Sequence, residues 1–141
     1  MDLAEIGDVQ FAYRSLEIVD FGPDGRAYGA MSGTLTGPRI SGRLELTNLA
    51  PLRPDNVNLP TLRGLLFTQD GGRVWAEFDG IARLREKDSA RLFVTSARFR
   101  TGDERYAWLN YVVGIMEGVL DTSGDLPKAR ARLFECRQTL T

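Results

Sequence analysis

The sequence predicts an all-β fold, an antiparallel and closed or nearly closed β-barrel of about eight strands that is lipocalin-like in outline. Apolar and polar residues alternate in short runs, and fifteen glycines and six prolines separate these runs. No window keeps a helical period for three turns. Closure is favoured over a sandwich because glycines within the runs suit a small barrel, and closure removes free sheet edges. The 141 residues fit a single domain, residues 1–141.

The first three predicted strands cover residues 9–20, 26–36 and 39–47. In the first strand, the apolar face shifts from Phe11 and Tyr13 to Leu16 and Ile18, which indicates a β-bulge. The second strand is rich in glycine, and a Gly-Pro pair at residues 37–38 separates it from the third. The third strand alternates strictly, with one apolar face made of Ile40, Leu44 and Leu46.

The next two predicted strands are residues 61–69 and 73–84, joined by an Asp-Gly-Gly turn. In the second of them, Val74, Ala76 and Phe78 form an apolar face, which we expect to point inward. Before these strands, residues 48–60 form one long irregular segment with three prolines, which exclude a helix interior or a central strand. Such a segment is either a lid or binding loop, or a structured crossover at the barrel rim.

The last three predicted strands are residues 90–101, 106–120 and 130–137. A Gly-Asp-Glu-Arg turn at residues 102–105 separates the first two. The best helical candidates are residues 3–10 and part of 106–118, and neither holds a helical period over three turns.

Histidine is absent and Cys136 is the only cysteine. This inventory excludes a Ser-His-Asp triad, a Cys-His pair, and a zinc or non-haem iron centre built on histidine or on several thiolates. We therefore expect no metal site and no cofactor. Any chemistry must use carboxylates, Tyr, Lys, Arg, hydroxyls or backbone amides.

The charges are balanced and interspersed, with eighteen basic and nineteen acidic residues and a net charge of −1. This pattern argues against a nucleic-acid partner and against a polybasic membrane patch. No apolar stretch is long enough for a membrane span, and residues 1–8 lack the features of a signal peptide. A single cysteine and no visible signal peptide lead us to expect a cytoplasmic protein.

Two motifs resemble a known family. The segment Gly-Thr-Leu-Thr-Gly-Pro-Arg-Ile-Ser-Gly at residues 33–42 is similar to the Gly-Thr-x-x-Gly-Pro-x-x-x-Gly signature of domain-of-unknown-function family 3237. The segment Phe-Arg-Thr-Gly-Asp-Glu-Arg-Tyr-Ala-Trp-Leu-Asn at residues 99–110 is similar to that family's second hallmark. The chain resembles a divergent member, since residues 49–52 read Leu-Ala-Pro-Leu where many members have Gly-Ala-Asp-Trp. The resemblance implies a single uncharacterised β-barrel domain and no particular activity.

The leading candidate site is the cluster of Tyr106, Trp108 and Asn110, which share one face of the strand predicted at residues 106–120. Two amphipathic aromatic residues and an amide suit a ligand-binding wall at the barrel mouth. The alternative is that the two aromatic residues close the barrel end and that the side chain of Asn110 forms hydrogen bonds with the backbone of a turn. Tyr106 is also a candidate acid or base.

A second group of candidates lies on neighbouring strands. Arg98, with Arg100, could bind a carboxylate or phosphate. Alternatively, it could form an ion pair with Glu77 or Asp79 on an outer polar face. Glu77 is a candidate acid or base if its face lines the lumen, and an ordinary surface charge if it does not. Trp75, on that same face, is a candidate ligand contact, because a tryptophan on a solvent-exposed face usually packs against a ligand or another protein surface.

Glu117 is a third acid/base candidate because it stands in an apolar run. A period of two from Val113 and Ile115 predicts that Glu117 lies on an apolar face, unless a neighbouring glycine shifts the register.

Three functions remain open from the sequence. The first is binding of a small apolar or aromatic metabolite in the lumen, whose floor would be Ile40, Leu44, Val74 and Phe78. The second is a cofactor-free isomerase or cyclase that uses a carboxylate or Tyr106 as its acid or base. Secondary metabolism is one setting for such an enzyme. The third is a structural module whose exposed aromatic residues pair it with a second copy as a homodimer or larger homo-oligomer.

Overall fold

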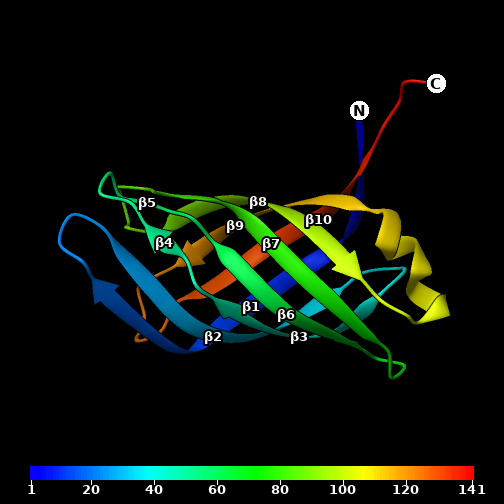
Figure 1. Ribbon diagram of the computed structural model, residues 1–141, viewed down its shortest axis with the longest axis horizontal. Coiled ribbons are helices and arrows are strands. Elements are labelled where there is room, and N and C mark those ends of the chain that lie inside the picture. Colours follow the sequence, from blue (N-terminus) through cyan, green and yellow to red (C-terminus); the bar gives the residue numbers. More distant parts are fainter.

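The computed structural model describes residues 1–141, and eight long antiparallel strands in it close into a barrel (Figure 1). This confirms the predicted fold class. The long strands are β1 (Asp2–Asp20), β2 (Gly25–Thr36), β3 (Ser41–Asn48), β6 (Thr61–Thr68), β7 (Arg73–Leu84), β8 (Arg91–Arg100), β9 (Val113–Asp121) and β10 (Lys128–Arg137). Two short strands, β4 (Pro51–Leu52) and β5 (Val57–Asn58), and one 3-10 helix, η1 (Glu104–Tyr111), complete the structure.

Around the barrel the long strands follow the order β1, β10, β9, β8, β7, β6, β3 and β2, and the pairing of β2 with β1 closes the ring. The segment between β3 and β6 does not leave the barrel. Its strand β4 pairs with the start of β2, and β5 pairs with the end of β7, so the segment bridges the rim. Of the two interpretations of residues 48–60, the structured crossover describes its conformation.

Alternation along each strand divides the residues between the lumen and the outside. In β7, Val74, Ala76 and Phe78 are buried, as predicted, while Trp75 and Asp79 on the other face are exposed. Inward residues from all eight long strands join one apolar core of 25 buried residues. The predicted bulge in the first strand is confirmed by a shift in the β1–β2 register between Tyr13 and Ser15.

Close approach of the strands explains some of the internal glycines. A Cβ atom at Gly80 would lie 2.0 Å from the backbone oxygen of Val94 on β8, and one at Gly64 would lie 1.9 Å from the backbone oxygen of Glu45 on β3. Neither contact is sterically allowed, so any side chain here would push paired strands apart.

Two sequence expectations were wrong. Residues 3–10, a helical candidate, belong to β1, because they pair with β10, with one register shift at Ile6. The strand predicted at residues 106–120 begins only at Val113, and η1 takes up the preceding residues. Asp103 caps that helix by accepting a hydrogen bond from the backbone N–H of Arg105 at 3.0 Å. No helix here has the length and apolar character needed to cross a membrane.

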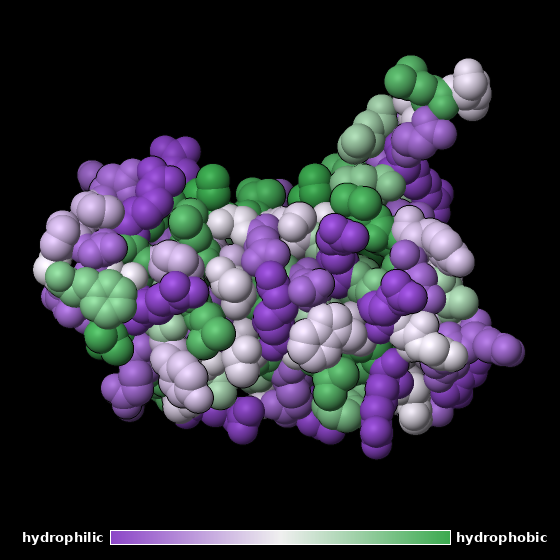
Figure 2. All heavy atoms as spheres, in the orientation of Figure 1, coloured by the Kyte–Doolittle hydropathy of each residue, from purple (hydrophilic) through white to green (hydrophobic).

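The two ends of the barrel differ (Figure 1). At one end lie η1, the turn between β6 and β7, and both chain termini. At the other end lie the crossover with β4 and β5 and the β1–β2, β7–β8 and β9–β10 turns. On the outside, hydrophilic and hydrophobic residues are interspersed over the face in Figure 2, and the terminal tail projects from the barrel.

Candidate functional site

A cavity of about 160 Å³ lies inside the barrel at the crossover end, opposite η1. Inward residues of β1, β2, β3, β6, β7, β8 and β9 form its wall, and the crossover supplies Ala50, Leu52, Asn58 and Pro60 at the rim. We call this end the mouth. The sheet closure places these residues around one space although they come from residues 11–127 of the chain.

The wall is mostly apolar. Two of its aromatic rings, Phe11 and Phe93, face each other at a centroid distance of 6.1 Å with their planes tilted by 43°. The side chain of Met31 is almost fully buried and also contacts the space. Such a wall favours an apolar guest, and the two rings favour an aromatic one.

Tyr13 and Asn48 form a buried polar pair in this wall. The Asn48 side chain is held in place because its Oδ1 accepts a hydrogen bond from the backbone N–H of Thr61 at 3.1 Å. Its Nδ2 then donates to the phenol oxygen of Tyr13 at 2.7 Å. Burial raises the pKa of the Tyr13 phenol above its ordinary value, and the hydrogen bond from Asn48 opposes that rise only in part.

This arrangement leaves the Tyr13 hydroxyl with a proton to donate. Its oxygen already accepts from Asn48, and its own O–H donates to no other group of the protein. Tyr13 therefore offers the cavity a neutral hydrogen-bond donor.

Thr95 places a second hydroxyl in the wall. Its side chain is 1% exposed, and its Oγ1 has no hydrogen-bond partner. A buried hydroxyl without a partner costs free energy, so such groups are rare in folded proteins. Thr95 thus belongs to the cavity lining, and no group of the protein uses its hydroxyl.

Arg91 brings a positive charge to the mouth. It is half-buried, lines the cavity, and donates a hydrogen bond to the backbone oxygen of Asn56 in the crossover. Burial lowers the pKa of its guanidinium, which nevertheless stays charged at neutral pH. No carboxylate forms an ion pair with Arg91, and no aspartate or glutamate lines the cavity.

The cavity can therefore hold a small apolar body and offer hydrogen-bond donors to its oxygen atoms. Its wall has neither a carboxylate nor a thiol, the usual protein ligands of a metal besides histidine. Nowhere in the structure do three or more carboxylate or thiol groups gather as a metal site.

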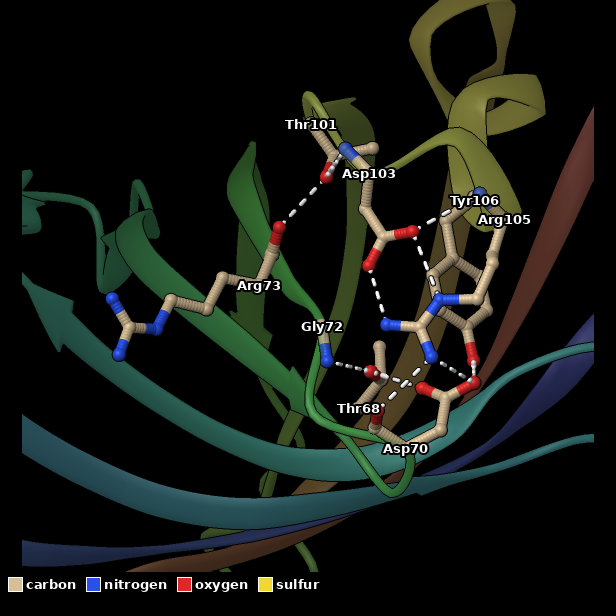
Figure 3. A network of polar contacts seen from close by, with 8 residues as sticks. All are labelled: Thr68, Asp70, Gly72, Arg73, Thr101, Asp103, Arg105 and Tyr106. Carbon is tan, nitrogen blue, oxygen red and sulfur yellow. Dashed lines mark hydrogen bonds and ion pairs between the residues drawn. The ribbon is translucent and has the colours of Figure 1, made fainter.

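The structure places Tyr106 at the opposite end of the barrel, in a polar network that fastens η1 to the β6–β7 turn (Figure 3). Its hydroxyl donates to Asp70 at 2.7 Å, and this bond is the main reason that the pKa of Tyr106 is raised. Arg105 contacts both Asp70, at 3.1 Å, and Asp103, at 2.7 Å. The Tyr106 hydroxyl is thus engaged in the network and does not face the cavity.

Trp108 and Asn110 also lie on η1, so the three residues share a helix and not the strand face that alternation predicted. Trp108 packs against the core, and the guanidinium carbon of Arg39 lies 3.6 Å from its ring centre. Asn110 accepts from the backbone N–H of Thr101 at 2.7 Å and donates to its oxygen at 3.0 Å. These contacts close this end of the barrel.

Trp75, Glu77 and Arg98 lie outside the barrel, where with Asn110 they line a surface groove of about 360 Å³. Glu77 pairs with Arg63 at 3.0 Å, and Arg63 also forms two bonds of 3.0 Å with Asp79. The structure thus brings four of the sequence-predicted residues together, but on the outer surface and away from the lumen.

Glu117 is exposed on the outer face of β9, because Gly114 and Met116 take the inward positions. The alternation from Val113 and Ile115 was read correctly, but that face points outward. Neither Glu77 nor Glu117 therefore contacts the cavity.

Sequence reasoning missed Tyr13, Asn48, Arg91 and Thr95 as a group. A signal was present, because Thr95 lies on the same strand face as Phe93 and Ala97, and Asn48 follows Leu44 and Leu46 on theirs. A polar residue on an otherwise apolar inward face marks a buried polar group. The chain alone does not show that these groups meet at one end.

No family model and no curated protein sequence matches this chain. The resemblance to domain-of-unknown-function family 3237 therefore stays a prediction, while the barrel itself has similar solved structures. A conserved protein of unknown function from Rhodopseudomonas palustris has a TM-score of 0.80 at 17% identity, over 95% of this chain and 96% of that one. A protein with unknown function from Clostridium acetobutylicum ATCC 824 has a TM-score of 0.79 at 15% identity, over 96% of this chain and 97% of that one.

A third similar structure is an enzyme from Penicillium herquei, with a TM-score of 0.67 at 17% identity over 93% of each chain. At these identities the likeness shows a shared fold and nothing finer. This chain is thus a β-barrel protein that resembles uncharacterised barrel proteins and one fungal enzyme.

Proposed function

We propose that this protein binds a small apolar or aromatic metabolite in its lumen, and that the guest enters at the mouth. The observation that carries the proposal is the cavity itself, an apolar space with a few fixed polar groups at the end of the barrel that η1 does not cover. Its volume of about 160 Å³ suits a guest of one ring, since an engineered apolar cavity of about 150 Å³ binds benzene.

The methionines provide a direct test. Met31 lines the cavity, Met116 is buried in the core without lining it, and Met1 is exposed at the far end. With the methionine methyl groups labelled with ¹³C, titration with toluene should produce a saturable shift of the Met31 signal. Met1 should not move, and Met116 should move less than Met31.

A filled variant makes the test specific. Ala82 lines the cavity, so Ala82→Leu should occupy part of the space and weaken toluene binding at least about tenfold. The matched control is Ala12→Leu, the same change on the outer face of β1, which should bind toluene as the wild type does. An unmoved Met31 signal for toluene and for other single-ring compounds would refute the proposal.

A second function, a cofactor-free isomerase or cyclase, is supported by Tyr13. It is the only group in the cavity that ordinarily gives up a proton, and its O–H is not used within the protein. The similar structure of an enzyme from Penicillium herquei supports this second function. In this second function, Tyr13 would be the acid or base, the role for which the sequence offered Glu77, Glu117 and Tyr106 as candidates.

A further inference from the structure

The polar groups of the cavity are biased toward donors, and this bias bears on the chemistry of the guest. Arg91 can only donate, and Tyr13 has its oxygen engaged with Asn48 and its proton free. Thr95 and Asn58 can each donate or accept. Nothing acidic in the wall balances Arg91. The complement of such a wall is a guest that carries oxygen acceptors and a negative charge.

Burial strengthens this preference. A half-buried guanidinium without a carboxylate partner interacts more strongly with an anion than an exposed one, because less water screens the charge. Planar guanidinium groups also bind carboxylates through two parallel hydrogen bonds. A guest carboxylate at the mouth would therefore supply the partner that Arg91 lacks.

The strand β8 sets the order of contacts along the lumen. Arg91, Phe93 and Thr95 occupy alternate positions, so all three point inward, from the mouth toward the middle of the barrel. Four residues of strand span about 13 Å, part of which the long arginine side chain covers. A ring that lies beside Phe93 and Phe11 would thus have Arg91 at one end and the buried Thr95 side chain, whose hydroxyl has no partner, at the other.

From these contacts, and resting on the proposed function, we infer that the guest is a single-ring aromatic carboxylate with an oxygen substituent on the side of the ring opposite the carboxylate. The carboxylate binds Arg91 at the mouth, the ring packs against Phe93, and the second oxygen reaches the Thr95 hydroxyl. The volume of about 160 Å³ matches a guest with one ring.

The test compares toluene, benzoate and 4-hydroxybenzoate at neutral pH, with the Met31 methyl signal as the readout. The wild type should bind benzoate about tenfold or more tightly than toluene, since hydrogen bonds to charged groups are strong. It should bind 4-hydroxybenzoate about fivefold more tightly than benzoate, through one further neutral hydrogen bond. Benzylamine, a cation of similar shape, should bind more weakly than toluene.

Variants assign these differences to residues. Arg91→Gln should remove the preference for benzoate over toluene, and Arg91→Lys should keep part of it. The matched control is Arg83→Gln, which removes the same charge from the outer face of β7 near the same rim. Thr95→Val should remove the preference for 4-hydroxybenzoate over benzoate.

The outcomes separate this inference from the proposed function. If toluene shifts the Met31 signal but benzoate binds no more tightly, or if Arg91→Gln and Arg83→Gln behave alike, the carboxylate assignment is wrong and lumen binding stands. If Thr95→Val keeps the preference for 4-hydroxybenzoate, the orientation of the guest is wrong. If none of the compounds shifts Met31, both the proposed function and this inference fail.

Discussion

The Thr95 hydroxyl is buried among apolar residues and makes no hydrogen bond within the protein. Its neighbours on the same strand face are Phe93 and Ala97, so a valine at this position would pack in an equally apolar setting. A buried hydroxyl without a partner lowers the stability of the folded state, because it gives up its hydrogen bonds with water on folding.

Thr95→Val should therefore raise the free energy of unfolding, by about 1 kcal/mol. Urea unfolding at neutral pH measures this change, and the slope of the transition should stay constant. Thr34→Val is the control, since Thr34 is exposed on β2 and its hydroxyl stays in contact with water in the folded state. A variant less stable than the wild type would show that this hydroxyl has a partner in solution.

Individual site residues were harder to predict than the strands that carry them. Glu77 and Glu117 were candidates because they are acids near apolar residues. For Glu77, the apolar face of its strand already favoured an outward position, whereas alternation alone does not say which face of the strand around Glu117 is inside. Arg91 was not a candidate, because an arginine at the start of a strand is common in any sequence. Its significance depends on its half-burial and on the absence of a carboxylate beside it, which only the folded chain defines.

At the scale of elements, η1 depends on its carboxylate contacts with Arg105. The hydrogen bonds from Arg105 hold the pKa of Asp103 below its ordinary value. The pKa of Asp70 is also lowered, first by the Thr68 hydroxyl and then by Tyr106. Lowered carboxyl pKa values mean that the unfolded chain binds these protons more tightly than the folded protein does. The network therefore stabilises the fold above the unfolded pKa of about 4, and this contribution is lost as the pH falls through the folded values.

Asp103→Asn should make the acid sensitivity of the protein smaller, because one of these titrating groups is gone. Between about pH 5 and about pH 2.5, the free energy of unfolding should fall less steeply for the variant than for the wild type. At neutral pH the variant should be less stable, since the cap of η1 and an ion pair are weakened. Asp24→Asn, in a turn without an ion pair, should keep the wild-type slope. Equal slopes for Asp103→Asn and the wild type would contradict this account.

Most strands were predictable because alternating burial is a local property of the sequence. The strand at Arg73–Leu84 has the predicted bounds, and its buried face is the predicted one. The helix η1 overlaps one of the two helical candidates, part of residues 106–118, but a strand was favoured there because tyrosine, tryptophan and asparagine at every second position imitate a strand face. The capping residue Asp103 was the contrary signal, since aspartate just before a helical segment is a common N-terminal cap.

At the scale of the whole molecule, the barrel depends on pairing between its first and last strands. β10 lies between β1 and β9 and pairs with both along most of its length. Without β10, those two strands would each have an unpaired edge, and the apolar core would be open to water on that side.

Removal of residues 128–141 should therefore abolish the native fold, seen as aggregation in size-exclusion chromatography and loss of near-ultraviolet circular dichroism. Removal of residues 138–141 alone is the control. These four residues lie outside β10 and are exposed, so their loss should leave the fold unchanged. A monomeric, native-like protein without residues 128–141 would show that closure is dispensable.

The pairing of Asp2 with Arg137 also fixes how this barrel can be attached to anything else. Both chain ends leave side by side from the end that carries η1 (Figure 1). A fusion partner, a purification tag or a surface linker joined at either terminus would therefore attach to the end of the barrel that carries η1. The rim with Arg91 would then face away from the attachment, so tethered protein should keep unhindered access for guests.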